Sequence, residues 1–76
     1  MRVEFKTEKR GYLLRLDQDL FGAFILFRHW WGLRNQRGGT KRQVFFDQDS
    51  ATREFHRIEK TRLRRGYIAV DRRSTT

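Results

Sequence analysis

The chain has 76 residues, with 18 Lys and Arg against nine Asp and Glu, and a formal net charge of +9. It has no cysteine, which excludes disulfides, thiolate catalysis and thiolate metal sites and indicates a reducing cytoplasm. The charged start, Met1–Arg10, is unlike a signal peptide, and the longest apolar run, Leu20–Phe27, is far shorter than the ~20 residues of a membrane helix. Composition therefore predicts one small soluble domain that makes no contact with membranes.

The first part of the chain predicts antiparallel strands. Val3 and Phe5 alternate with charged residues, and Tyr12, Leu14 and Leu16 alternate with Leu13, Arg15 and Asp17. Two paired strands are therefore predicted, the second ending at the Asp17–Asp19 turn. Residues 20–27 contain no polar side chain, which is typical of a strand covered on both faces or offering one face to a partner. We interpret this run as the central strand.

A hairpin with a basic tip is predicted next. A short strand over residues 30–33 precedes the segment 35–39, whose Asn and Gly content marks a turn, and apolar residues 44–46 follow. Residues 67–70 have the composition of a last strand, and the polar tail 71–76 is expected to fray.

One helix is predicted over Gln48–Arg64. Apolar side chains recur at helical spacing in this segment, several N-cap residues precede it, and Gly66 is a natural C-cap. The fold class is therefore α+β: an antiparallel sheet of about five strands with one long helix on one face and the other face less protected. A single domain spans residues 1–76, with an ordered core of about residues 2–70.

The cations favour a phosphate-bearing ligand. Fourteen of the 18 are Arg, whose planar guanidinium makes two parallel hydrogen bonds to an anion. Residues 28–46 contain no acid but five of these cations: Arg28, Arg34, Arg37, Lys41 and Arg42. Arg62 continues the apolar stripe of the predicted helix, so either its stem extends past apolar neighbours to water or its guanidinium is held for an anion. Alternatively, the excess charge only keeps a small protein soluble.

Trp30, Trp31 and Gly32 form the second unusual feature. Consecutive strand residues point to opposite faces, so one indole is expected to be exposed. An exposed indole beside arginines can stack on a base or sugar while the cations hold phosphates, or it can simply cover the sheet edge. Gly32 lets a backbone or a ligand approach closely.

Several segments now stand in a recognisable order. They are Tyr12–Leu16, Asp19–Gly22, Trp31-Gly32 with Gly38, Ala51-x-x-x-Phe55-x-x-Ile58 with Arg62, and Leu63–Tyr67. This series covers most of the chain and resembles the WGR domain, a module named for a Trp-Gly-Arg tripeptide and found in DNA-damage-responsive poly(ADP-ribose) polymerases and in short bacterial proteins. The resemblance implies that Trp31 stacks on a sugar or base at a strand end and that Arg62 replaces a helix Lys of the family.

The signature itself departs from the family pattern. Leu33 stands where the family has Arg, and Asn35 stands where it has Gly. Asn tolerates left-handed geometry, so the turn is retained. A role that depends on the signature Arg does not carry over to Leu33, and Arg34 points to the other face of a regular strand.

These observations predict a nucleic-acid-binding module of low sequence specificity, with DNA preferred over RNA. The predicted binding residues are Arg28, Trp30, Trp31, Gly32, Arg34, Arg37, Lys41, Arg42 and Arg62. The alternative is a protein-interaction or self-association module that uses the apolar face around Leu20–Phe27, as a homodimer or with a larger protein partner.

An enzyme is the least supported interpretation. Only His29 and His56 are bases near neutral pH, and no Ser/His/Asp grouping or phosphate-binding Gly loop is present. The pairs Asp17-x-Asp19 and Asp47-x-Asp49 are better explained by turn and helix-cap roles than by a metal ion. No cofactor is predicted.

Overall fold

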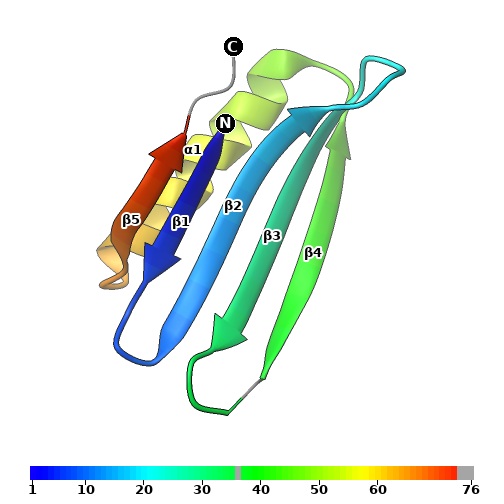
Figure 1. Ribbon diagram of the computed structural model, residues 1–76. Helices are drawn as coiled ribbons and strands as arrows, with labels where there is room; N and C mark the ends of the chain where they lie inside the picture. The colour runs from blue at the N-terminus through cyan, green and yellow to red at the C-terminus, as the bar shows by residue number, and fades with distance from the viewer. Residues whose placement is uncertain (36, 74–76) are drawn as a thin grey trace.

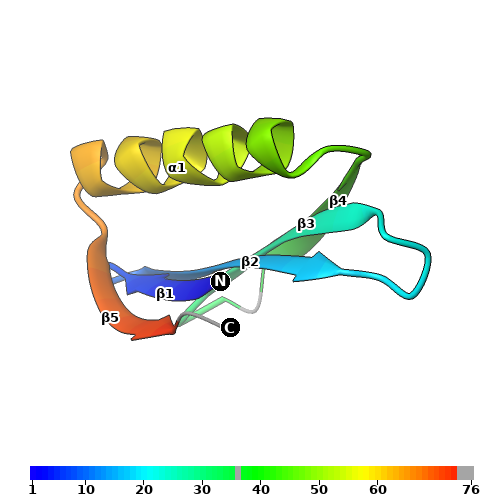
Figure 2. The same cartoon turned by 90° about the horizontal axis from the view of Figure 1, so that it is seen from above.

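The computed structural model describes residues 1–35 and 37–73, which form one antiparallel sheet covered on one face by a helix (Figures 1 and 2). The elements are β1 (Arg2–Lys6), β2 (Arg10–Gln18), β3 (Phe24–Gly32), β4 (Gly38–Phe45), α1 (Gln48–Arg64) and β5 (Ile68–Arg73). The five strands lie in the order β4-β3-β2-β1-β5. The predicted α+β class is confirmed.

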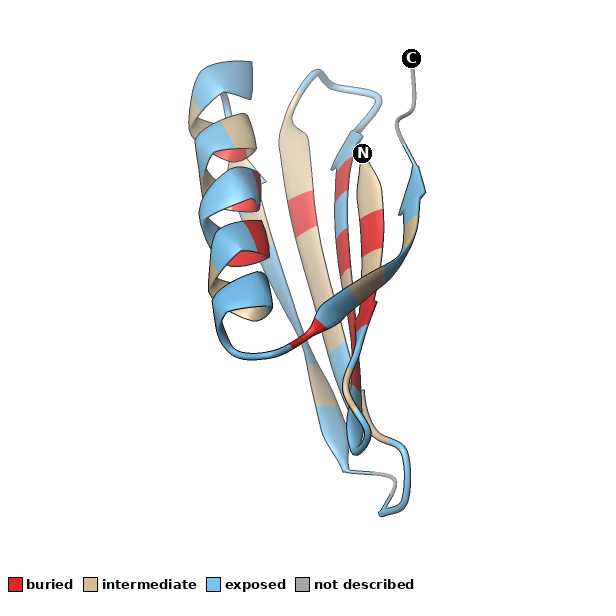
Figure 3. Ribbon diagram, turned by 90° about the vertical axis from the view of Figure 1, so that its left-hand side faces the viewer, coloured by how far each residue is buried: buried red, intermediate tan, exposed pale blue. Residues whose placement is uncertain are grey.

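The core lies between α1 and the sheet. Alternate side chains of β1, β2 and β3 point toward the helix and pack against its apolar stripe, and Figure 3 shows these buried positions as bands on the strands and on the inner side of α1. The buried set is Val3, Phe5, Tyr12, Leu14, Leu16, Leu26, Ala51, Phe55, Ile58 and Tyr67. The opposite face of the sheet carries no helix (Figure 2). We call it the open face.

Both ends of α1 match the sequence prediction. The Asp47 side chain accepts a hydrogen bond of 2.7 Å from the Ser50 backbone N–H, which satisfies one of the donors left free in the first turn. Gly66, with φ of 91°, follows the C-cap residue Arg65 and turns the chain toward β5. No helix in residues 1–35 and 37–73 has the length and apolar content needed to cross a membrane.

The prediction of one strand over Leu20–Phe27 is wrong in its first half. Asp19 Oδ1 accepts hydrogen bonds from the backbone N–H groups of Phe21 (2.8 Å) and Ala23 (2.9 Å), and Gly22 has φ of 89°. These interactions fix a turn, so β3 begins at Phe24 and continues through Trp30–Gly32, which the sequence pattern had separated.

Two further features differ from the sequence prediction. The central strand is β2 and not β3, because β5 extends the sheet beyond β1. β5 runs to Arg73, three residues past the predicted end at Val70, because Arg73 pairs with Arg2. Gln36 of the predicted turn and residues 74–76 of the predicted tail lie outside the described residues.

A buried carboxylate connects α1 to β5. Glu59 is 9% exposed, accepts a hydrogen bond from Arg72 Nη1, and lies 3.1 Å from His56 Nδ1. Burial by itself raises the pKa of this carboxyl, but the hydrogen bonds and charges of Arg72 and His56 together outweigh burial and lower the pKa below its ordinary value of 4.5.

We expect Phe55→Ala to destabilise the fold by about 3–5 kcal/mol, because it removes a 2% exposed ring from the centre of the helix–sheet contact. Phe46→Ala is the matched control: Phe46 is 87% exposed, so its loss changes the free energy of unfolding by about 0.5 kcal/mol or less. Urea denaturation measures both, and equal effects would contradict the assigned core.

We expect Glu59→Gln to be less stable than wild type at neutral pH, with the difference shrinking as the solution is acidified. A carboxyl whose pKa is lowered by folding stabilises the protein above its unfolded pKa, and this contribution is lost as pH falls through the folded pKa. Thermal melts from pH 7 to pH 3 measure the difference. A constant difference across that range would show that the charge of Glu59 does not contribute.

Candidate nucleic-acid interface

Basic segments gather at the end of the sheet where β2 begins and β3 ends. The backbone N–H of Leu33 donates to Lys9 O (2.9 Å), which ties the β3–β4 turn to the β1–β2 turn, and the last turn of α1 lies at the same end (Figure 1). Glu8 is the only acid in residues 6–10, 33–37 and 62–66. We call this the basic end; its cations are Lys6, Lys9, Arg10, Arg34, Arg37, Arg62, Arg64 and Arg65.

A recess of about 690 Å³ opens at the basic end, with Trp30 in its wall. The Trp30 indole is 39% exposed and stacks on Tyr12, with ring centres 6.3 Å apart and planes 19° apart. Gly39 pairs with Trp30 across the strands, and a Cβ there would lie 2.8 Å from the indole. The Trp30 recess is lined by Lys9, Arg10, Tyr12, Arg28, Trp30, Trp31, Gly32, Asn35, Arg37, Gly38, Arg62 and Tyr67.

Two arginines from different elements line the Trp30 recess. The Arg62 guanidinium lies 4.7 Å from the ring centre of Tyr12 and 5.5 Å from that of Tyr67, so the helix arginine is held over aromatic faces. Arg28 Nη2 donates to Gln43 Oε1 (2.9 Å) and lies 3.7 Å from Glu54 Oε2. The Nε atoms of Arg28 and Arg62 are buried without a hydrogen-bond partner among the described residues.

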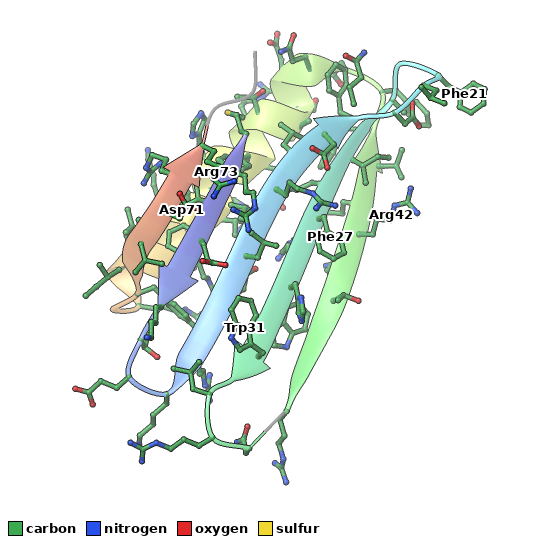
Figure 4. All side chains as sticks on the ribbon, viewed as in Figure 1. Phe21, Phe27, Trp31, Arg42, Asp71 and Arg73 are labelled. Carbon is green, nitrogen blue, oxygen red and sulfur yellow. The ribbon has the colours of Figure 1, made fainter. Side chains whose placement is uncertain are left out.

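The second indole, Trp31, lies on the open face (Figure 4). It packs against Gly11, where a Cβ would overlap the indole, and meets His29 edge to face at 5.1 Å. His29 in turn meets Phe27 edge to face at 6.5 Å. The two indoles therefore point to opposite faces, as strand alternation predicted, and the more exposed one is Trp30 because Trp31 is half-buried.

The structure divides the predicted binding residues into three groups. Arg28, Trp30, Trp31, Gly32, Arg37 and Arg62 line the Trp30 recess. Arg34 is exposed in the β3–β4 turn and lines an adjoining surface with Lys9 and Arg65. Lys41 and Arg42 lie on the edge strand β4, outside the recess, and Arg42 is on the open face (Figure 4).

Sequence reasoning missed six lining residues: Lys9, Arg10, Tyr12, Asn35, Gly38 and Tyr67. Strand pairing was the signal that could have found Arg10, because an antiparallel β2–β3 pair places Arg10 opposite Gly32. Asn35 Oδ1 accepts from the Arg37 backbone N–H (3.1 Å) and approaches Gly32 so closely that a side chain there would overlap it. The lack of a side chain at Gly32 therefore leaves room for the side chain of Asn35 in the turn.

The basic end differs from the open face in its ion pairing. On the open face, Asp71 pairs with Arg2 (3.2 Å) and with Arg73 (3.1 Å), and Arg15 pairs with Asp17 (2.7 Å). Within residues 1–35 and 37–73, no acid lies within ion-pair distance of any of the eight basic-end cations. No ion pair among these residues therefore neutralises them.

The model of the WGR domain matches residues 2–75 of the chain. The chain therefore belongs to the WGR family. The match covers every strand and the helix, and the Trp31-Gly32 pair lies within it at the end of β3. No curated protein and no solved structure matches the chain. In this WGR domain Leu33 is 44% exposed, and its backbone N–H makes the bond to Lys9 that joins the two turns.

We expect Gly11→Ala to displace the Trp31 indole and to destabilise this WGR domain by about 1–3 kcal/mol through overpacking. Near-UV circular dichroism reports the displacement, and urea denaturation measures the free energy of unfolding. In a Trp31→Val background the cost of Gly11→Ala should largely disappear, because the overlapping ring is gone. An unchanged cost in that background would contradict the assigned contact.

Proposed function

We propose that this WGR domain binds nucleic acid at its basic end. The single observation that carries the proposal is the Trp30 recess, which combines a 39% exposed indole with Arg10, Arg37 and Arg62, none of which has an acid within ion-pair distance among the described residues. A nucleotide fits this combination, because its flat base or sugar packs on the indole and its phosphate oxygens accept from the arginines.

In this proposal the phosphates contact five of the basic-end cations, Lys9, Arg10, Arg34, Arg37 and Arg62, while Arg28, which pairs with Glu54, also lines the recess. Trp30 and Trp31 offer a ring on each face of the same strand end. Lys41 and Arg42 add positive potential beside the recess without lining it. Phosphate contacts carry no base information, so sequence specificity is low, and nucleic-acid structure such as an end or a single strand is recognised instead.

The proposed role is that of a binding module, not an enzyme, acting on DNA in preference to RNA in the cytoplasm and without a cofactor or metal ion. Supporting this role, Asp19 and Asp47 serve as turn and helix-cap residues, which accounts for one acid in each of the two Asp-x-Asp pairs. Membership of the WGR family, which includes modules of DNA-damage-responsive polymerases, points in the same direction.

The test is a titration of the protein with blunt duplex, nicked duplex and single-stranded DNA over a series of salt concentrations. Five or six phosphate contacts predict that log affinity falls with log salt at a slope of roughly −4 to −5. Arg37→Gln should reduce the slope by about one, whereas the matched control Arg73→Gln should leave it unchanged, because Arg73 is paired with Asp71. A flat salt dependence would rule the proposal out.

The same assay distinguishes the contributions of Trp30 and Trp31. Trp30→Ala and Trp31→Ala should each weaken binding by roughly fivefold to 100-fold if their rings stack on the ligand, with the loss depending on the DNA substrate. Equal losses on all three substrates, accompanied by a lower melting temperature, would assign a structural role to that indole.

A further inference from the structure

Two chain connections at the end of the sheet opposite the basic end are acidic. Phe24 pairs with Gln18 on one side and with Phe45 on the other, so segments 17–22 and 45–50 lie next to each other. These segments contain Asp17, Asp19, Asp47 and Asp49 and no cation. Asp17 pairs with Arg15, whereas Asp19, Asp47 and Asp49 make no ion pair among the described residues. We call segments 17–22 and 45–50 the acidic tip.

Three large apolar side chains are exposed on the acidic tip: Leu20 at 99%, Phe21 at 95% and Phe46 at 87%. Figure 4 shows Phe21 projecting beyond the end of the sheet. The turn that presents Leu20 and Phe21 is fixed by the hydrogen bonds to Asp19 and the positive φ of Gly22. A fixed turn that holds apolar rings in water indicates a contact surface.

The surface of this chain that complements the acidic tip is its own basic end. The tip presents an aromatic ring two residues from a carboxylate, Phe21 beside Asp19. The Trp30 recess presents an exposed indole beside Arg10, Arg37 and Arg62, which have no acid partner in the part of the chain that the structure describes. Ring against ring and carboxylate against guanidinium are both favourable pairings. The tip therefore offers the recess the same two groups, a flat ring and an anion, that a nucleotide offers.

We propose that the Trp30 recess of one copy binds the acidic tip of a second copy, with Phe21 inserted against Trp30. The molecule measures 38 × 21 × 19 Å, and the two surfaces lie at opposite ends of the sheet (Figure 1). The contact is head to tail, so each added copy leaves one tip and one recess open and chains grow. The interface is small, so half-association falls on the order of 0.1–1 mM.

Head-to-tail association occupies the recess that the proposed function assigns to nucleic acid. DNA and the acidic tip therefore compete, and this competition rests on the proposed function. The association itself does not rest on it.

The experiment uses two variants that each lose one surface. Phe21→Ser removes the ring of the tip and keeps the recess, and Arg10→Glu/Arg37→Glu reverses two exposed charges of the recess and keeps the tip. Sedimentation velocity of wild type from about 10 μM to 2 mM should show growing assemblies. Each variant alone should need at least about tenfold higher concentration to associate. Their equimolar mixture should form a one-to-one dimer, because one intact tip then meets one intact recess.

Val70→Ser is the matched control: Val70 is 54% exposed on the edge strand β5, outside both surfaces, and its loss should leave association unchanged. Circular dichroism should be identical for all variants, since the substituted side chains are exposed. A wild type that stays monomeric at 2 mM, a Phe21→Ser variant that associates like wild type, or a mixture that stays monomeric would each overturn the proposal.

DNA titration of the same variants separates this inference from the proposed function. Phe21→Ser should bind DNA as wild type does at dilute concentration, because Phe21 lies at the end opposite the recess. Association without any DNA binding would contradict only the proposed function, and DNA binding by a strict monomer would contradict only the head-to-tail contact.

Discussion

The contact between the apolar stripe of α1 and one face of the sheet determines where the candidate site lies. Phe55 and Ile58 can be buried only if this side of the helix faces the sheet, chiefly β2 and β3. Arg62 follows Ile58 by four residues, so the same rotation places its guanidinium over Tyr12 and Tyr67. The core register thus holds a cation beside Trp30, and a shift of the helix by one turn would separate them.

Local signals explain which elements were predictable from the sequence. The helix bounds Gln48–Arg64 agree with the structure because Asp47 and Gly66 act on their own neighbours, through a hydrogen bond and a positive φ. The β1–β2 pairing follows from alternation in the same way. The prediction of one strand over Leu20–Phe27 was wrong because apolar composition alone does not distinguish a covered strand from an exposed turn. The hydrogen bonds that the Asp19 side chain accepts fix the turn.

Which residues line the Trp30 recess depends on contacts between strands, and the spacing of residues in the sequence does not reveal these contacts. Alternation correctly placed Trp30 and Trp31 on opposite faces, but the exposure of each ring is set by Gly39 and Gly11 on neighbouring strands. Likewise, Arg28 turns toward the helix and lines the recess. Arg42, on the paired strand, turns to the open face (Figure 4), because strand register fixes which side each side chain takes.

Chain order accounts for the separation of charge between the two ends. In consecutive antiparallel strands, the β1–β2 and β3–β4 turns fall at one end and the β2–β3 turn at the other, together with the link from β4 to α1. The sequence places cations in the first pair of turns and aspartates in the other two connections. The turns of the basic end therefore attract a polyanion more strongly than the connections of the acidic tip do.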